Sequence, residues 1–225
     1  MTGRILKIAH QAGGAGPGLR SVFVLAGCGL HCRYCPCPNA SQSLSGRKMT
    51  AEECAYTLFP YDATLRRGGG VTIAGGSVNQ EAPFALEFLS LLKERGYHTA
   101  LMTSGDYREG EEDGVERILR KTDMVIVDIK ALTEEGYAMM GGSLARVLAF
   151  LNFAEAAGCA IRLRMMIVPG ENDTEAAMQR LKRMTAHLLY LENIELVPYR
   201  RALFPGAKAP DCPDETIERL QAYVS

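Results

Sequence analysis

The chain has 225 residues, of which 47% are hydrophobic and 23% are charged, and these proportions are typical of a folded domain with a substantial core. Its formal net charge of -1 provides no general attraction for phosphate backbones or anionic lipid, so we expect neither a nucleic acid nor a membrane partner. No run of about eighteen apolar residues could cross a bilayer, and the first ten residues lack the apolar stretch of a secretory signal. We therefore expect one domain over residues 1–225, located in the cytoplasm.

Segments with the apolar, β-branched character of buried strands recur along the chain. The first, Arg4–His10, is expected to form an edge strand or to cover a hairpin. The others, in chain order, are Ser21–Ala26, Gly70–Ala74, His98–Thr103, Met124–Ile129, Ala160–Val168 and Ile194–Val197. Apolar residues at helical spacing predict helices between several of these strands, at Gln80–Arg95, Leu144–Ala157 and Thr174–Leu191.

This order of elements predicts the fold class. A strand followed by a helix, repeated about six times without an obvious linker, is typical of an α/β fold with parallel strands and right-handed crossovers. Either an open sheet or a barrel satisfies the pattern. A full eight-unit barrel typically needs about 250 residues, so the sequence favours a shorter, partial (β/α)6 barrel of the TIM-like type.

Three cysteines crowd into one short segment directly after the strand Ser21–Ala26. They are Cys28, Cys32 and Cys35, and in an α/β fold this position places them at the edge of the sheet where ligands bind. Three thiolates around a four-iron cluster leave one iron without a protein ligand. The spacing therefore predicts a 4Fe-4S cluster with one open coordination position.

Two alternatives to this interpretation stay open. The first alternative is a structural zinc site. Such a site normally has four ligands, often as two separated pairs, whereas here the three cysteines lie in one loop without a distant pair. Cys37 lies close enough in sequence to close the open position as a fourth ligand, although Pro36 and Pro38 restrict its backbone. The remaining cysteines, Cys54, Cys159 and Cys212, are expected in helical, strand and loop contexts as buried or incidental thiols.

The spacing CxxxCxxC, with the aromatic Tyr34 directly before the last cysteine, resembles the hallmark of the radical S-adenosylmethionine (SAM) superfamily. Within that superfamily the chain resembles the pyruvate formate-lyase activating enzymes and related glycyl-radical-enzyme activases over nearly its whole length. Six segments match activase motifs in order, namely Ala15–Arg20, Gly75–Ser77, Met102–Gly105, Asp128–Lys130, Arg164–Gly170 and Leu196–Arg200. The resemblance implies a radical SAM fold.

The resemblance also implies a chemistry. SAM would bind the free iron through its amino and carboxylate groups, and an electron from the reduced cluster would cleave it to methionine and a 5'-deoxyadenosyl radical. In the activases this radical abstracts a hydrogen atom from a glycine of a partner glycyl-radical enzyme. The segment near that glycine corresponds to Gly16, Gly18 and Arg20. Because the chain has no second cysteine set, flavodoxin or ferredoxin is implied as the external electron donor.

Individual SAM contacts follow from the matched motifs. Gly75 and Gly76 let the backbone pass close to the cosubstrate, and Asp128 can accept hydrogen bonds from its ammonium or ribose. Lys130 and Arg164 can pair with its carboxylate. A strand-end turn, a helix cap and solvated surface charges are the corresponding structural alternatives. The other SAM contacts that the motifs imply are Tyr34, Ser77, Thr103, Ser104, Val197, Tyr199 and Arg200.

Four positions depart from the activase pattern. Ala15, Ser77 and Met102 stand where the activases have acids, and Arg200 stands where they have a histidine. Hydrogen bonds from an ammonium to such acids contribute about 1.5–3 kcal/mol each, so we expect SAM binding to be weaker or reorganised. Arg200, with Arg201 beside it, can instead hold the carboxylate through two hydrogen bonds. The change at Met102 also removes an acid from the monovalent cation site of the activases.

Three hypotheses about function follow. The leading one is an activase of a glycyl-radical enzyme. The four changed positions also suit a radical SAM enzyme that acts on a small molecule or peptide. A non-catalytic iron-sulfur protein is the third hypothesis, and it predicts that no 5'-deoxyadenosine forms.

Overall fold

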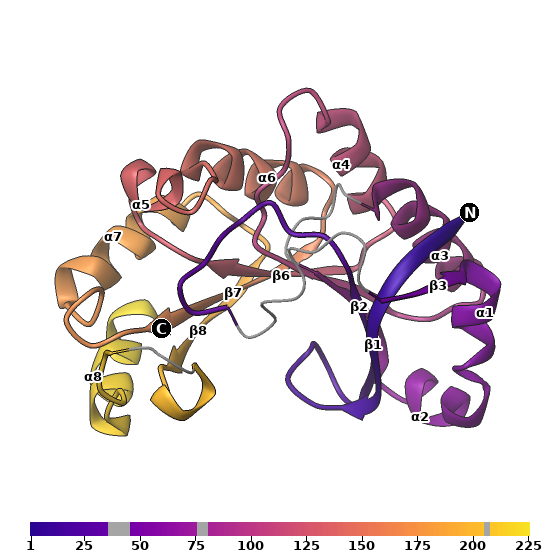
Figure 1. The fold of residues 1–225 in the computed structure, drawn as a ribbon, viewed down its shortest axis with the longest axis horizontal. Coiled ribbons are helices and arrows are strands. Elements are labelled where there is room, and N and C mark those ends of the chain that lie inside the picture. Colours follow the sequence, from indigo (N-terminus) through magenta and orange to yellow (C-terminus); the bar gives the residue numbers. More distant parts are fainter. Residues whose placement is uncertain (36–45, 76–80, 205–207) are drawn as a thin grey trace.

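The computed structural model describes residues 1–35, 46–75, 81–204 and 208–225 (Figure 1). Its strands form one sheet in the order β3-β1-β2-β4-β5-β6-β7-β8. The strand bounds are β1 Thr2–Ala12, β2 Arg20–Leu25, β3 Arg47–Thr50, β4 Gly70–Ala74, β5 Thr99–Thr103, β6 Met124–Ile129, β7 Ala160–Ile167 and β8 Leu191–Pro198. The helices are α1 Ala51–Tyr56, α2 Asp62–Arg66, α3 Ala82–Glu94, α4 Glu112–Leu119, α5 Glu134–Ala138, α6 Leu144–Ala156, α7 Glu175–Thr185 and α8 Asp214–Val224, with 3-10 turns η2 Phe59–Tyr61 and η4 Arg201–Leu203.

Strands β2, β4, β5, β6, β7 and β8 follow one another in the sheet, and each pair of neighbours among them is parallel. This confirms the predicted α/β order. Figure 1 shows helices α3, α4, α6, α5 and α7 along the outer side of a curved sheet. The concave side opens between the β1–β2 hairpin and the α8 region. This arrangement is consistent with the predicted partial barrel.

The two faces of the sheet differ in character, because successive side chains of a strand point to opposite faces. On β6 and β7 the outer face carries buried residues such as Val127 and Leu163, which belong to the main hydrophobic core. The concave face of β7 carries Arg162, Arg164 and Met166, each only partly buried. The concave face is therefore where charged side chains gather inside the arc of helices.

The N-terminal expectation is confirmed as a hairpin. Strand β1 pairs antiparallel with β2. The first residues of β1, Thr2–Ile5, also pair antiparallel with β3. Along those first residues the edge of the sheet is β3 rather than β1. The register of the hairpin shifts near Gln11, which adopts a left-handed φ of 56°.

The helix predicted over Thr174–Leu191 was wrong at its C-terminal end, because α7 stops at Thr185. The Thr185 hydroxyl donates to the carbonyl of Leu181 at 3.0 Å, and the chain then turns. The Glu155 carboxylate accepts from the backbone N–H groups of Leu189 and Tyr190 at 2.8 and 3.1 Å. Tertiary bonds thus override an apolar spacing that continues to Leu191.

The other predicted elements are confirmed with small shifts of their ends. The predicted start of α3, Gln80, lies outside the described residues, and Cys159 lies directly before β7 rather than within a strand. Cys54, Cys159 and Cys212 are buried free thiols, as expected. In the part of the chain that the structure describes, we find no helix long and apolar enough to cross a membrane.

Candidate active site

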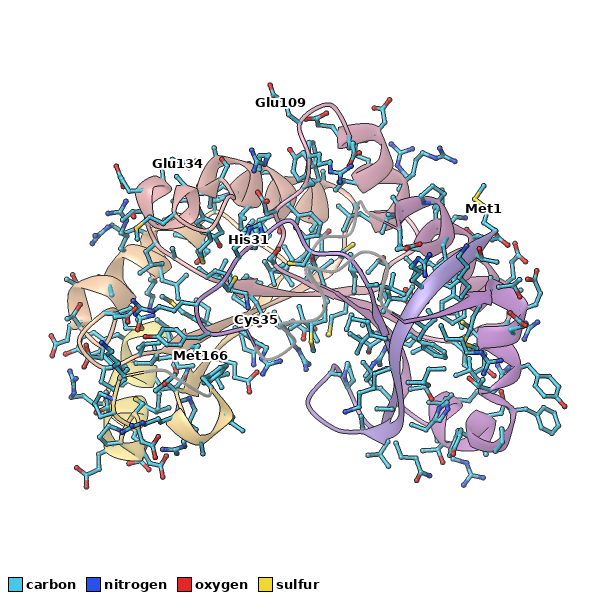
Figure 2. All side chains as sticks on the ribbon, in the orientation of Figure 1. Met1, His31, Cys35, Glu109, Glu134 and Met166 are labelled. Carbon is cyan, nitrogen blue, oxygen red and sulfur yellow. The ribbon has the colours of Figure 1, made fainter. Side chains whose placement is uncertain are left out.

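The cysteine loop, residues 26–35, leaves the C-terminal end of β2 through Gly27, whose φ of 97° suits a glycine. Two contacts fix its course. The N–H of His31 donates to the carbonyl of Met140 at 2.9 Å, and Leu30 is 4% exposed. A Cβ on Gly142 would come within 2.5 Å of the Leu30 side chain, so any larger residue at this position would force Leu30 to move. Figure 2 shows His31 toward α5 and α6, and Cys35 inside the arc of helices.

The three thiols of the loop share one electrostatic environment. Cys28, Cys32 and Cys35 are free and half-buried. Burial raises the pKa of the Cys32 thiol to about 11, although the nearby Lys130 ammonium opposes this rise and the other two cysteines add to it. Burial is also the main cause that raises the pKa of Cys28. A metal centre would therefore have to displace protons from Cys28 and Cys32 when it binds.

The thiols can be compared with the demands of two kinds of metal centre. Among the described residues, no three His, Cys, Asp or Glu side chains lie close enough together to hold one metal ion. A four-iron cluster makes a different demand, because each of its three thiolates binds a different iron atom. Three free, half-buried thiols in one loop, each able to bind a different iron atom, are the set of ligands that this second demand requires. Cys37 lies outside the described residues, so its role as a fourth ligand stays a prediction.

The neighbouring strand ends supply a turn and two buried hydroxyl residues. Gly75 follows β4, and its N–H donates to the carbonyl of Met102 at 3.1 Å. Thr103 and Ser104, at the end of β5, are 2% and 3% exposed. The N–H of Gly105 donates to the Thr103 hydroxyl at 3.2 Å. Gly76 and Ser77, which belong to the predicted SAM site, lie outside the described residues.

Charged residues on β6, β7 and β8 lie at one level of the sheet. In the strand register Asp128 is opposite Arg164, and Arg164 is opposite Glu195. The Lys130 ammonium lies 3.3 Å from Asp128, and the Arg164 Nε lies 3.1 Å from Glu195. Among the described residues, the buried Arg164 Nε nevertheless has no hydrogen-bond partner, because its N–H is not directed at that carboxylate. Arg164 Nη1 also contacts the Met102 sulfur at 3.9 Å. Two cations with replaceable partners thus lie at this level.

The last matched motif, Leu196–Arg200, has side chains that make contacts in two different places. The Tyr199 side chain is fully buried, and its ring lies at a centroid distance of 4.9 Å from that of Tyr34. Its hydroxyl has no hydrogen-bond partner in the part of the chain that the structure describes. Val197 lies opposite Met166 in the β7–β8 register. Arg200 instead donates to the carbonyl of Cys212 at 2.7 Å and pairs with Asp214 at the start of α8. The structure therefore brings Tyr199 to the cysteine loop and engages Arg200 elsewhere.

The segment with Gly16, Gly18 and Arg20 lies at the opposite end of the strands from the cysteine loop, because Arg20 and Gly70 begin β2 and β4. Arg20 is fully buried and bonds the Thr72 hydroxyl at 2.6 Å and the Val71 carbonyl at 2.8 Å. Burial lowers the pKa of its guanidinium to about 10, so it stays charged at neutral pH.

Gly18, with a φ of 62°, leaves no room for a Cβ, which would lie 2.3 Å from the Gly68 carbonyl. This turn is therefore locked onto the base of β4, and Arg20 has no surface to offer a partner.

Two residues of the site were not predicted from the sequence. Asp106, after β5, is 6% exposed, and its carboxylate accepts from Arg146 Nε at 2.9 Å and from the Ser143 N–H at 3.1 Å. Its place after a strand end is a signal that could have found it. Glu171 accepts from the Tyr34 hydroxyl at 2.8 Å. Nothing in the local sequence marks Glu171, because its partner is far away in the chain.

Comparisons with known proteins agree with this picture. A family model described as the Radical SAM superfamily matches residues 22–181. The chain is 37% identical over 199 residues to a pyruvate formate-lyase-activating enzyme of Clostridium pasteurianum, covering 88% of this chain and 82% of the relative. It is 30% identical over 223 residues to pyruvate formate-lyase 1-activating enzyme of Escherichia coli K12, covering 93% and 89%.

Solved structures share the fold. A domain of a pyruvate-formate lyase-activating enzyme from Bacteroides vulgatus has a TM-score of 0.58 at 20% identity, covering 69% of this chain and 92% of that one. Streptococcus suis SuiB bound to precursor peptide SuiA has a TM-score of 0.69 at 15% identity, covering 90% and 44%.

Proposed function

Because the chain belongs to the radical SAM superfamily, whose members use SAM and an iron-sulfur cluster, we propose that it is an activase that takes a hydrogen atom from a glycine of a partner glycyl-radical enzyme. The observation that carries this proposal is the loop of three half-buried thiols at the C-terminal end of β2. The names of the Clostridium and Escherichia relatives support the activase assignment. We also propose that residues 1–225 act as a single domain.

We assign a 4Fe-4S cluster to Cys28, Cys32 and Cys35, with one iron left for SAM. Held by these three thiolates, such a cluster would, once reduced, supply one electron for cleavage of a carbon-sulfur bond of SAM, which would give methionine and a 5'-deoxyadenosyl radical able to take a hydrogen atom. The chain holds the thiolates in place through the bond between His31 and the Met140 carbonyl. Its partial burial of the thiols limits the access of water to the cluster.

Recognition of SAM is assigned to the charged side chains at the level of Asp128. Lys130 and Arg164 can turn from Asp128 and Glu195 to the carboxylate of the cosubstrate. Asp128 is then free to accept hydrogen bonds from the ammonium. The backbone of Gly75 can approach closely because it carries no Cβ.

The acid missing at Met102 has a consequence for this arrangement. The Met102 sulfur contacts Arg164 Nη1 at 3.9 Å, so a guanidinium lies where the activases place an acid beside the ligand. We therefore expect the carboxylate of SAM to be held more strongly than its ammonium. An external flavodoxin or ferredoxin is proposed as the electron donor, since Cys54, Cys159 and Cys212 are single buried thiols in three separate segments of the chain and form no second cysteine set.

Electron paramagnetic resonance tests the activase proposal. Anaerobically reconstituted and reduced protein, mixed with SAM and a glycyl-radical enzyme such as pyruvate formate-lyase, is expected to produce the doublet of a glycyl radical. Substrate enzyme labelled with deuterium at the glycine α-carbon should give a collapsed signal, because the remaining α-hydrogen causes the splitting. The Cys32→Ala variant is the matched control and should give no signal.

A different result would redirect the proposal. If 5'-deoxyadenosine forms but none of the glycyl-radical enzymes tested, pyruvate formate-lyase among them, acquires a doublet, the activase assignment is wrong. The radical SAM chemistry would then act on another substrate.

A further inference from the structure

One carboxylate outside the matched motifs holds both residues that separate the second and third cysteines. Glu171, in the loop between β7 and α7, accepts from the Tyr34 hydroxyl at 2.8 Å and forms an ion pair with Arg33. The Arg33 guanidinium also lies 4.7 Å from the centre of the Tyr34 ring. Rotation of the backbone between Cys32 and Cys35 would break these contacts together.

The turn that presents Glu171 is itself fixed by side-chain bonds. The Asn172 amide accepts from the Val168 N–H at 2.8 Å and donates to the Met166 carbonyl at 2.8 Å. The N–H of Gly170 donates to the Asp173 carboxylate at 2.9 Å. Glu171 is therefore offered to the cysteine loop from a braced turn at the end of the strand that carries Arg164.

The ring of Tyr34 is held from its other side by buried aromatic residues. Tyr199 and Phe204 stack on each other at 5.3 Å, and each presents its ring to the edge or face of Tyr34, at 4.9 and 5.8 Å. Tyr199 and Phe204 are 0% and 6% exposed. Tyr34 is thus held at its ring by a buried aromatic pair and at its hydroxyl by the carboxylate of Glu171.

We propose that Glu171 is a positioning residue, which fixes the Cys32–Cys35 half of the cysteine loop in the geometry that binds the cluster. This inference rests on the proposed function, because it takes the three thiols to be cluster ligands. The role is local. The side chains of Arg33 and Glu171 are 69% and 44% exposed, and ion pairs this exposed contribute little to global stability.

Alkylation of the metal-free protein tests the inference without using enzymatic activity. Iodoacetamide labelling, followed by mass spectrometry of each cysteine peptide, is expected to proceed about fivefold faster at Cys32 and Cys35 in Glu171→Ala than in the wild type. The buried Cys54 should be labelled at an unchanged rate. The thermal midpoint should also stay unchanged.

Two further variants sharpen the test. Glu175→Ala is the matched control, because Glu175 forms an exposed ion pair with Arg219 at 3.5 Å, and it should leave labelling of the loop unchanged. Tyr34→Phe removes one bond to Glu171 and keeps the ring, so it should give an intermediate acceleration. Reconstituted Glu171→Ala should retain less iron per chain than reconstituted Glu175→Ala.

Equal labelling rates in wild type and Glu171→Ala would overturn the inference, and so would an equal acceleration at Cys54, which indicates global loosening. Neither result would affect the proposed function. If wild-type protein binds no iron and forms no 5'-deoxyadenosine, the proposed function fails, whatever the labelling rates are.

Discussion

The buried carboxylate of Asp106 should stabilise both the fold and the cysteine loop. It joins the end of β5 to Ser143, the N-cap of α6. The carbonyl of Met140, three residues before Ser143, accepts the hydrogen bond from the His31 N–H of the cysteine loop. Asp106→Ala would leave the Ser143 N–H without its acceptor and the Arg146 guanidinium without its partner.

The magnitude follows from these contacts. A hydrogen bond to a charged group contributes about 1.5 kcal/mol or more. The ion pair contributes roughly 1–2 kcal/mol, between the values for exposed and buried pairs, because the Arg146 side chain is 31% exposed whereas that of Asp106 is 8% exposed. Together they predict a loss of about 3 kcal/mol in the free energy of unfolding. For a domain of this size that loss lowers the thermal midpoint by roughly 6–12 °C.

Urea unfolding of metal-free protein, followed by circular dichroism, measures this loss. A double-mutant cycle with Arg146→Ala should give a coupling energy of about 1–2 kcal/mol. Glu116→Ala, which breaks an exposed helix ion pair with Arg120, is the matched control and should cost under about 0.5 kcal/mol. A coupling energy near zero, or equal losses in Asp106→Ala and Glu116→Ala, would refute the reasoning.

Three further predictions concern other parts of the chain. Arg20→Met leaves the buried Thr72 hydroxyl and the Val71 and His98 carbonyls without their donor and should lower the free energy of unfolding by about 3–5 kcal/mol in urea, and a loss under about 1 kcal/mol would show that these hydrogen bonds do not stabilise the fold. For Asp123, burial is the largest single cause and raises the pKa, but the hydrogen bonds from Lys93 and Thr99 together outweigh it, so the pKa is lowered. The Asp123 charge therefore stabilises the fold above the unfolded pKa of about 3.9, and this contribution is lost as the pH falls through the folded pKa. Asp123→Asn should therefore reduce stability at pH 7 and flatten its fall toward pH 3, and an unchanged acid limb would argue against this assignment. Gly142→Ala would press a methyl group within 2.5 Å of Leu30, so anaerobic reconstitution should load less iron per chain, and wild-type loading would show that the loop adapts freely.

Most of the fold was predictable because its information is local. Strands such as β4 and β6 are short runs with one polar residue each, Thr72 and Asp128, among apolar ones, and the predicted bounds Gly70–Ala74 and Met124–Ile129 agree with the structure. The C-terminal end of α7 was not predictable. It depends on Glu155, which comes from another helix and bonds to the chain beyond Thr185.

The candidate site divides in the same way. The three candidate cluster ligands could be predicted from the sequence because they lie within eight consecutive positions, from Cys28 to Cys35. Contacts between residues far apart in the chain could not be predicted from the sequence. Asp106 is 40 residues from Arg146, and Glu171 is 137 residues from Tyr34, so no local pattern links either pair.

The formation of 5'-deoxyadenosine by reduced, iron-loaded protein tests the central claim most directly. Incubated anaerobically with SAM and dithionite, the wild type should release 5'-deoxyadenosine and methionine in equal amounts, measured by chromatography. Cys28→Ala, Cys32→Ala and Cys35→Ala should each release none. Wild-type protein that carries a full complement of iron and still releases no 5'-deoxyadenosine would contradict the account.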